Sequence, residues 1–306
     1  MKRAVVLGAN GFVGTWVVKE LINNNVFVYA VVRDKNSDLE KLHNLKNVEI
    51  IYCSLENILN LDQYIKVKDI DVLYNFAWNG SAGSKRMDAK LQLDNVLWTI
   101  NSVQAARNLG CKRFVGAGSI MEKESIMANY TQQNAPGMAY IYGDAKVAAH
   151  CMSKSVAASL GIDHVWGLIT NAYGEGEYSP RFVNTTIRKI IDREVLNFTS
   201  GIQNYDFVYI SDVAKAFYLL GLYGRNNCEY VIGSSYAKPL KEFIIEIQQK
   251  LAPDQELNFG NVPFTGINLS IEEFDTTMTE TDTGFKASVS FGDGIKKTME
   301  WIKTIE

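Results

Sequence analysis

The fold is decided near the N-terminus, by the stretch Ala4-Val5-Val6-Leu7-Gly8-Ala9-Asn10-Gly11-Phe12-Val13-Gly14. Its apolar beginning predicts a short buried strand, and glycines with the spacing G-x-x-G-x-x-G follow directly. A turn this tight needs residues without a Cβ atom, and the helix after it presents unpaired N–H groups at the positive end of its dipole. The stretch therefore predicts a pyrophosphate-binding turn of a dinucleotide site, made by Gly8, Asn10, Gly11, Phe12, Val13 and Gly14.

The composition is that of an ordinary globular protein. Of the 306 residues, 47% are hydrophobic and 21% are charged, and the formal net charge is -3. The lysines and arginines form no cluster, which argues against nucleic acid or a membrane surface as partner and favours a small molecule. The cysteines are far apart and form no C-x-x-C pair, so we expect neither a metal site nor a disulfide framework.

The sequence also predicts a location in the cytoplasm. The apolar run at residues 4–7 is too short for a secretory signal before the glycine turn. No later segment reaches the roughly 18 apolar residues of a membrane span. Free thiols fit a reducing compartment.

Short β-branched runs alternate with stretches of helical period, which is typical of repeated βαβ units. The expected strands are Ala4–Leu7, Phe27–Val32, Val48–Tyr52, Val72–Phe76, Arg113–Val115 and Asp163–Ile169. The expected helices include Val13–Asn23, Leu91–Leu109 and Asp144–Leu160. Right-handed crossovers then give an α/β fold with a doubly wound parallel sheet of the Rossmann type.

The regular alternation weakens after Asn171, which predicts a smaller C-terminal substrate-binding lobe. A loop at residues 174–180 is followed by a helix and by short strands near Asn197 and Asp206. A helix over residues 211–223 and a strand at residues 230–232 are expected to return to the main sheet. We therefore assign residues 1–170 and about 206–235 to the dinucleotide domain, and about 171–205 and 236–306 to the lobe.

The end of the second expected strand carries basic side chains. It reads Val31-Val32-Arg33-Asp34-Lys35, where a dinucleotide site commonly presents an acidic residue to the ribose 2′-OH. Arg33 would instead bind a 2′-phosphate through a planar, charge-assisted fork, with Lys35 as a helper, which favours NADP. A shift of one residue in the strand end would put Asp34 in this place, so NAD stays the alternative.

Tyr142 and Lys146 form a candidate proton-transfer pair. They lie four residues apart, near the start of an expected helix, and so share one helix face. A nearby ammonium favours the phenolate, which would let Tyr142 exchange a proton with a carbonyl or alcohol oxygen. The strand that precedes this helix leads to Ser119, whose hydroxyl would reach the carboxyl edge of the sheet, where ligands bind in such folds.

With these features the chain resembles the extended short-chain dehydrogenase/reductase family, in particular its nucleotide-sugar epimerases, dehydratases and ketoreductases. The resemblance covers nearly the whole chain. It rests on the turn at residues 8–14, Asn75-Phe76-Ala77, Asn95, Ser119, Tyr142 with Lys146, Asn171-Ala172-Tyr173-Gly174 and Asp206-Phe207-Val208-Tyr209-Ile210-Ser211-Asp212.

The resemblance implies a role for each matching residue. Ser119 would bind the substrate oxygen, Tyr142 would be the acid/base, and Lys146 would bind the cofactor ribose and tune Tyr142. Phe76 and Ala77 would flank the cofactor. The candidate substrate contacts are Asn171 at the pyrophosphate, Tyr205 beside the nucleotide pocket, Ser119, and Asn95 as a support within its helix. The family also implies a nucleoside-diphosphate sugar as substrate and a homodimer.

Departures from the family pattern narrow the function. The 4,6-dehydratases of the family carry Asp-Glu after the hydroxyl residue, whereas this chain has Ile120 and Met121, so we do not expect dehydration. Glu122 follows and is expected at the surface or in a loop. Tyr205 stands where the family often has arginine, so the phosphate charge would come from Arg181 or Lys189.

Three functions stay open. A ketoreductase would use exchangeable NADPH to reduce a keto-sugar nucleotide, and Arg33 favours this reading. The layout resembles synthases that reduce 4-keto-6-deoxy sugars for bacterial surface polysaccharides. An epimerase would keep NAD bound, and a dinucleotide sensor would have the fold without turnover. The histidines match no motif, and His164 is expected to be structural.

Overall fold

The structure is a computed structural model that describes residues 1–306, and its centre is a seven-stranded parallel sheet. The strand order is β11-β6-β5-β4-β1-β2-β3, so the order reverses between β1 and β4. Ligands of doubly wound sheets bind at this reversal, outside the carboxyl ends of the strands. The strands are β1 Arg3–Leu7, β2 Phe27–Val32, β3 Val48–Tyr52, β4 Val72–Asn75, β5 Arg113–Ser119, β6 Asp163–Ile169 and β11 Cys228–Ile232.

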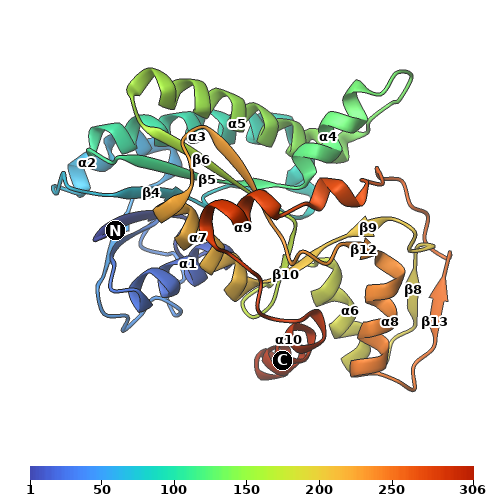
Figure 1. Ribbon diagram of the computed structural model, residues 1–306. Helices are drawn as coiled ribbons and strands as arrows, with labels where there is room; N and C mark the ends of the chain where they lie inside the picture. The colour runs from blue at the N-terminus through green and yellow to red at the C-terminus, as the bar shows by residue number, and fades with distance from the viewer.

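The two faces of the sheet are covered by different helices (Figure 1). Helices α1 (Phe12–Asn23) and α7 (Ile210–Tyr223) pack together on one face, and α3 (Ala89–Asn108) and α5 (Ile141–Leu160) pack together on the other. In β1, Ala4 and Val6 join one buried apolar cluster, and Val5 and Leu7 join the other. Burial of both faces explains why the strand is a continuous apolar run.

The expected fold class is confirmed. The fifth strand was expected over Arg113–Val115 with its end leading to Ser119, and β5 runs without a break to Ser119. Gly116 and Gly118 let the Trp166 indole of β6 lie directly on the strand, since a Cβ atom at either position would overlap that ring. Helix α4 (Met121–Tyr130) follows and was not expected at all.

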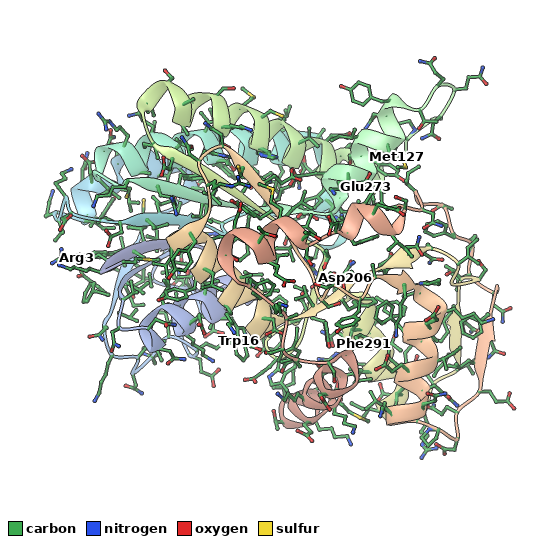
Figure 2. The ribbon with its side chains drawn as sticks, in the orientation of Figure 1. Arg3, Trp16, Met127, Asp206, Glu273 and Phe291 are labelled. Carbon is green, nitrogen blue, oxygen red and sulfur yellow. The ribbon has the colours of Figure 1, made fainter.

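The lobe lies beyond the carboxyl ends of the strands (Figure 1). Its core contains closely packed aromatic rings. The Phe207 ring has its centre 4.9 Å from that of Phe243 and 5.3 Å from that of Phe291. In Figure 2 the labelled Asp206 and Phe291 lie on the side of the molecule between the sheet and α8. Its elements are β7 Asn171–Tyr173, α6 Phe182–Ile191, β8 Leu196–Phe198, β9 Asn204–Tyr205, β10 Phe207–Tyr209, β12 Lys238–Pro239, α8 Leu240–Leu251, β13 Leu257–Phe259 and α10 Phe291–Ile305.

One part of the C-terminal segment differs from the expected division. Helix α9 (Thr277–Thr283) packs against α7 and β11 of the main domain, although we assigned residues 236–306 to the lobe. The buried Thr279 hydroxyl donates to the Val231 carbonyl at 2.7 Å, which fixes the helix to the edge strand. A further short helix, α2, spans Leu61–Tyr64. No helix has the combined length and apolarity that crossing a membrane demands.

Candidate active site

The glycine turn packs directly against the end of β4. Gly8 has a φ of +73°, and a Cβ atom there would lie 2.9 Å from the Ala77 backbone. A Cβ atom at Gly14 would overlap the Gly8 carbonyl oxygen, so the first turn of α1 can lie against the loop only without a side chain. The N-terminus of α1 therefore faces the cleft with its N–H groups free for an anion, and this arrangement fits a pyrophosphate.

A cavity of about 220 Å³ continues from this turn along the ends of β2 and β4. Arg33 lines the cavity, whereas Lys35 is not among its lining residues. Phe76 and Ala77 form part of its wall, as expected for residues beside a cofactor. The other expected cofactor residues that line it are Gly8, Asn10 and Gly11.

The three predicted catalytic residues meet at a neighbouring cavity of about 120 Å³, which Phe12 and Val13 also line. Ser119 ends β5, and Tyr142 and Lys146 lie one turn apart in the first half of α5. The Lys146 ammonium donates to the Ala117 carbonyl at 2.7 Å and lies 3.8 Å from the centre of the Trp78 ring. The structure thus brings the hydroxyl, phenol and ammonium groups together beside the cofactor turn.

The surroundings shift the pKa of both titratable groups. Burial raises the pKa of the Tyr142 phenol, while Arg181, Arg86 and the Ser119 hydroxyl lower it. Burial lowers the pKa of the Lys146 ammonium to about 8, and the Glu122 carboxylate acts in the opposite direction. Lys146 is therefore close to its titration range at neutral pH.

Glu122 is deeply buried, which corrects its expected place at the surface. Only 3% of it is exposed. One carboxylate oxygen accepts the Ser119 N–H at 2.9 Å and the Trp166 indole N–H at 3.1 Å. The other oxygen lies 3.3 Å from Nδ1 of His150. Because α4 was not expected, nothing in the sequence predicted that this side chain would lie under the predicted catalytic residues.

Two of the three histidines, His150 and His164, stack together near this carboxylate. His164 is buried in β6, in agreement with a structural role, and the His150 ring stacks on Trp166 with centres 4.6 Å apart. His150 also lies 3.5 Å from a Glu229 carboxylate oxygen. Glu122, His150 and Glu229 are the residues whose potential metal-binding atoms come within 4.8 Å of one another.

A cavity of about 290 Å³ adjoins the predicted catalytic residues on the side of the lobe. Of the expected residues, it is lined by Ser119, Tyr142, Asn171, Tyr205 and Arg181. Lys189 instead lines a separate surface hollow on α6. Asn95 is buried within α3, and its amide exchanges two hydrogen bonds of 2.8 Å with the Asn79 backbone, which suits the supporting role inferred for it.

Besides Glu177, which pairs with Arg181, two charged residues of this cavity were not predicted from the sequence, Arg86 and Glu124. Arg86 lies in the loop between β4 and α3, with its guanidinium carbon 4.5 Å from the centre of the Tyr142 ring. Glu124 lies in the first turn of α4, where burial raises the pKa of its carboxyl to about 7 and Arg86 lowers it. Neither residue belongs to a recognisable motif.

Comparison with known families gives one clear match. The model described as the NAD dependent epimerase/dehydratase family matches residues 4–233, a span from β1 to the end of β11. This span contains the glycine turn and every residue that lines the cavities of 220, 120 and 290 Å³, except Thr298, which lines the last of them.

Similar proteins cover the whole chain. A putative UDP-glucose 4-epimerase of Methanocaldococcus jannaschii is 26% identical over 312 residues, 98% of this chain and 98% of that protein. The dTDP-4-dehydro-6-deoxyglucose reductase of Escherichia coli is 24% identical over 314 residues, 98% of this chain and 97% of the enzyme. Proteins named dTDP-D-glucose 4,6-dehydratase are also similar.

Solved structures share the fold. The UDP-N-acetylglucosamine 4-epimerase from Methanobrevibacter ruminantium M1 is 20% identical, has a TM-score of 0.83, and the match covers 100% of this chain and 99% of that one. At this identity the likeness extends to the fold alone, and it agrees with the doubly wound sheet described above.

Proposed function

The chain belongs to the NAD dependent epimerase/dehydratase family and is an enzyme of the extended short-chain dehydrogenase type, and from this premise we propose that it reduces a keto-sugar nucleotide. The substrate class we infer is a 4-keto-6-deoxyhexose linked to a nucleoside diphosphate. The observation that carries the proposal is the cavity where Ser119, Tyr142 and Lys146 meet Phe12 and Val13 of the cofactor turn. The similar reductase of Escherichia coli supports the choice of substrate class.

Each of the predicted catalytic residues would have a separate role in the reaction. A bound nicotinamide would supply hydride to the substrate carbon. Ser119 would hold the carbonyl oxygen, and Tyr142 would protonate the alkoxide that develops on it, so that the phenol O–H bond breaks as the substrate O–H bond forms. Lys146 would hold the ribose of the cofactor. The adjoining cavity, lined by Asn171 and Tyr205, would take the nucleoside diphosphate.

The cofactor we propose is NADP, with NAD as the alternative. Arg33 lines the cavity at the end of β2, where a 2′-phosphate would lie. An arginine fork recognises a phosphate better than a ribose hydroxyl. The family description names NAD, so the preference for NADP rests on Arg33 alone.

The second candidate function is an NAD-dependent nucleotide-sugar 4-epimerase, favoured by the similar epimerase of Methanocaldococcus jannaschii. Dehydration has less support because Ile120 and Met121, in place of the acidic pair, cannot transfer protons. A sensor without turnover has the least support, since the three catalytic side chains share one cavity. The homodimer, the cytoplasmic location and a role in surface polysaccharide synthesis stay predictions.

The nucleotide released on denaturation tests the choice between reductase and epimerase. Mass spectrometry of the released material, followed by titration of cofactor-free protein with NADPH and NADH, separates the two. Exchangeable cofactor with a preference for NADPH supports the reductase. Retained NAD that does not exchange contradicts it and favours the epimerase.

Replacing Tyr142 by phenylalanine tests the chemistry. We expect a loss of turnover of at least about 100-fold, because acid–base groups contribute 10²–10⁴ in rate. Cofactor binding, measured by the fluorescence of bound NADPH, should stay unchanged. Unchanged turnover in Tyr142→Phe would exclude Tyr142 as the acid/base.

A further inference from the structure

Arg86 occupies a defined place over the predicted acid/base. Its guanidinium carbon lies 4.5 Å from the centre of the Tyr142 ring, within the range of a cation–π interaction. Its Nε atom is buried and makes no hydrogen bond within the protein. The residue also lines the same 290 Å³ cavity as Ser119 and Tyr142. Its position is therefore unlike that of a solvated surface arginine.

Buried polar side chains of α3 hold the loop that carries Arg86. The Gln92 amide donates to the Gly80 carbonyl at 3.1 Å and to the Lys85 carbonyl at 2.9 Å. It also accepts the Trp78 indole N–H at 2.8 Å. Gln92 is only 1% exposed, so this bracing is protected from water. The backbone of Lys85, the residue before Arg86, is anchored in this way. This anchor supports the position of the Arg86 guanidinium against Tyr142 of α5.

The ammonium of Lys146 lies farther from the Tyr142 ring centre than the Arg86 guanidinium does. It lies 6.0 Å from the centre of the Tyr142 ring and donates to the Ala117 carbonyl. The other charged groups that act on Tyr142 are Arg181 at the start of α6 and Glu122 of α4, which oppose each other. Arg181 also forms an ion pair with Glu177, in which its Nε lies 3.1 Å from a carboxylate oxygen. This ion pair partly neutralises the charge of Arg181.

We propose that Arg86 is a further residue of the reaction site, where its guanidinium stabilises the phenolate form of Tyr142. The inference rests on the proposed role of Tyr142 as proton donor. When Tyr142 gives its proton to the substrate oxygen, a negative charge is left on the phenol. A cation fixed over the ring before the reaction lowers the energy of this state without any rearrangement. Burial raises the Tyr142 pKa overall, and Arg181 and then Arg86 lower it, which agrees with this role.

The test is the ionisation of Tyr142 itself. A difluorotyrosine placed at position 142 reports its own titration by fluorine NMR, and its lower intrinsic pKa keeps the titration within the range where the protein is folded. In cofactor-free protein we expect Arg86→Met and Arg86→Gln to raise the midpoint by about one pH unit, a tenfold change in the ionisation equilibrium. Arg86→Lys should restore part of the shift. Lys85→Gln, the exposed neighbour, should leave the midpoint unchanged.

An unchanged midpoint in folded Arg86→Met or Arg86→Gln overturns the proposal. So does a Lys146→Met variant that raises the midpoint more than either of them, because the ammonium would then be the dominant cation. The titration needs no turnover, so its outcome is independent of the proposed reaction. If Tyr142→Phe stays active while Arg86→Met shifts the midpoint, the proposed function fails and the electrostatic role of Arg86 stands.

Discussion

The cofactor side and the substrate side of the cleft are built in different ways. On the cofactor side, one continuous stretch from Leu7 to Gly14 supplies the strand end, the turn and the helix N-terminus. On the substrate side, the cavity wall comes from separate segments that include Arg86, Glu124, Asn171 and Tyr205. The first region depends on backbone approach, and the second depends on side chains brought together from across the chain. Substitutions should therefore damage the first through folding and the second through chemistry.

The largest expected effect is at Gly14. In an ordinary helix, Gly→Ala stabilises by up to about 1 kcal/mol. At Gly14 the added Cβ atom would overlap the Gly8 carbonyl oxygen, so we expect Gly14→Ala to destabilise the protein by about 3 kcal/mol and to abolish dinucleotide binding. Thermal unfolding and NADPH titration measure both effects.

The matched control is Gly137→Ala, where an added Cβ atom meets nothing within 4 Å. Its effect should stay within about 0.5 kcal/mol. If Gly14→Ala is as stable as this control and still binds NADPH, then the cofactor side does not depend on close backbone approach.

The difference between the two sides also explains which parts of the fold can be predicted from the sequence. The strands Phe27–Val32 and Asp163–Ile169 lie where the apolar runs predict them, because a buried parallel strand consists of consecutive apolar residues. The edge strand Val48–Tyr52 also lies where it was expected, although only Ile51 in it is buried. The end of β5 depends in addition on a contact between strands, because Trp166 of β6 lies where a Cβ atom at Gly116 or Gly118 would be.

The predicted catalytic side chains show the same difference. Ser119, Tyr142 and Lys146 could be named in advance from one strand end and one helix face, and they share a cavity. Arg86 and Glu124 could not, because their relevance arises only when the loop before α3 and the first turn of α4 meet over α5. The burial of a carboxylate such as Glu122 is equally hard to predict when its helix is not expected.

An intermediate effect is expected at Glu122. Glu122→Gln keeps the size of the side chain and one acceptor oxygen for the Ser119 N–H, but it removes the charge that raises the Lys146 pKa. We expect kcat to fall roughly tenfold, equivalent to about 1.4 kcal/mol, with KM little changed. The pH profile should shift as well, because the Lys146 pKa would fall below its present value of about 8.

Glu229→Gln is the matched control for this change. Glu229 also lies beside His150, but it makes no hydrogen bond to Ser119 or Trp166. We expect its kcat and pH profile to stay close to those of the unmodified enzyme. Equal effects of the two variants would mean that charge near His150, rather than support of Ser119 and Lys146, controls the rate.

The smallest expected effect is at Glu124 and concerns stability as a function of pH. The pKa of this carboxyl is raised from 4.5 to about 7, mainly by burial, so in this interval the folded chain holds a proton that the unfolded chain has released. The contribution of Glu124 to the free energy of unfolding is therefore fully present below about pH 4.5. It falls as the pH rises to about 7 and changes no further above that value. Glu124→Gln stays neutral and escapes this loss.

The Tm of Glu124→Gln should therefore match that of the unmodified protein near about pH 4.5 and exceed it by a few degrees near about pH 8. Circular dichroism at the two pH values measures the difference. A gain of equal size at both would contradict the raised pKa, since an uncharged carboxyl and an amide differ little at low pH. In that case the Glu124 carboxylate would be charged at both pH values and the Arg86 guanidinium would balance its charge. The two residues would then have to be treated as one unit next to Tyr142.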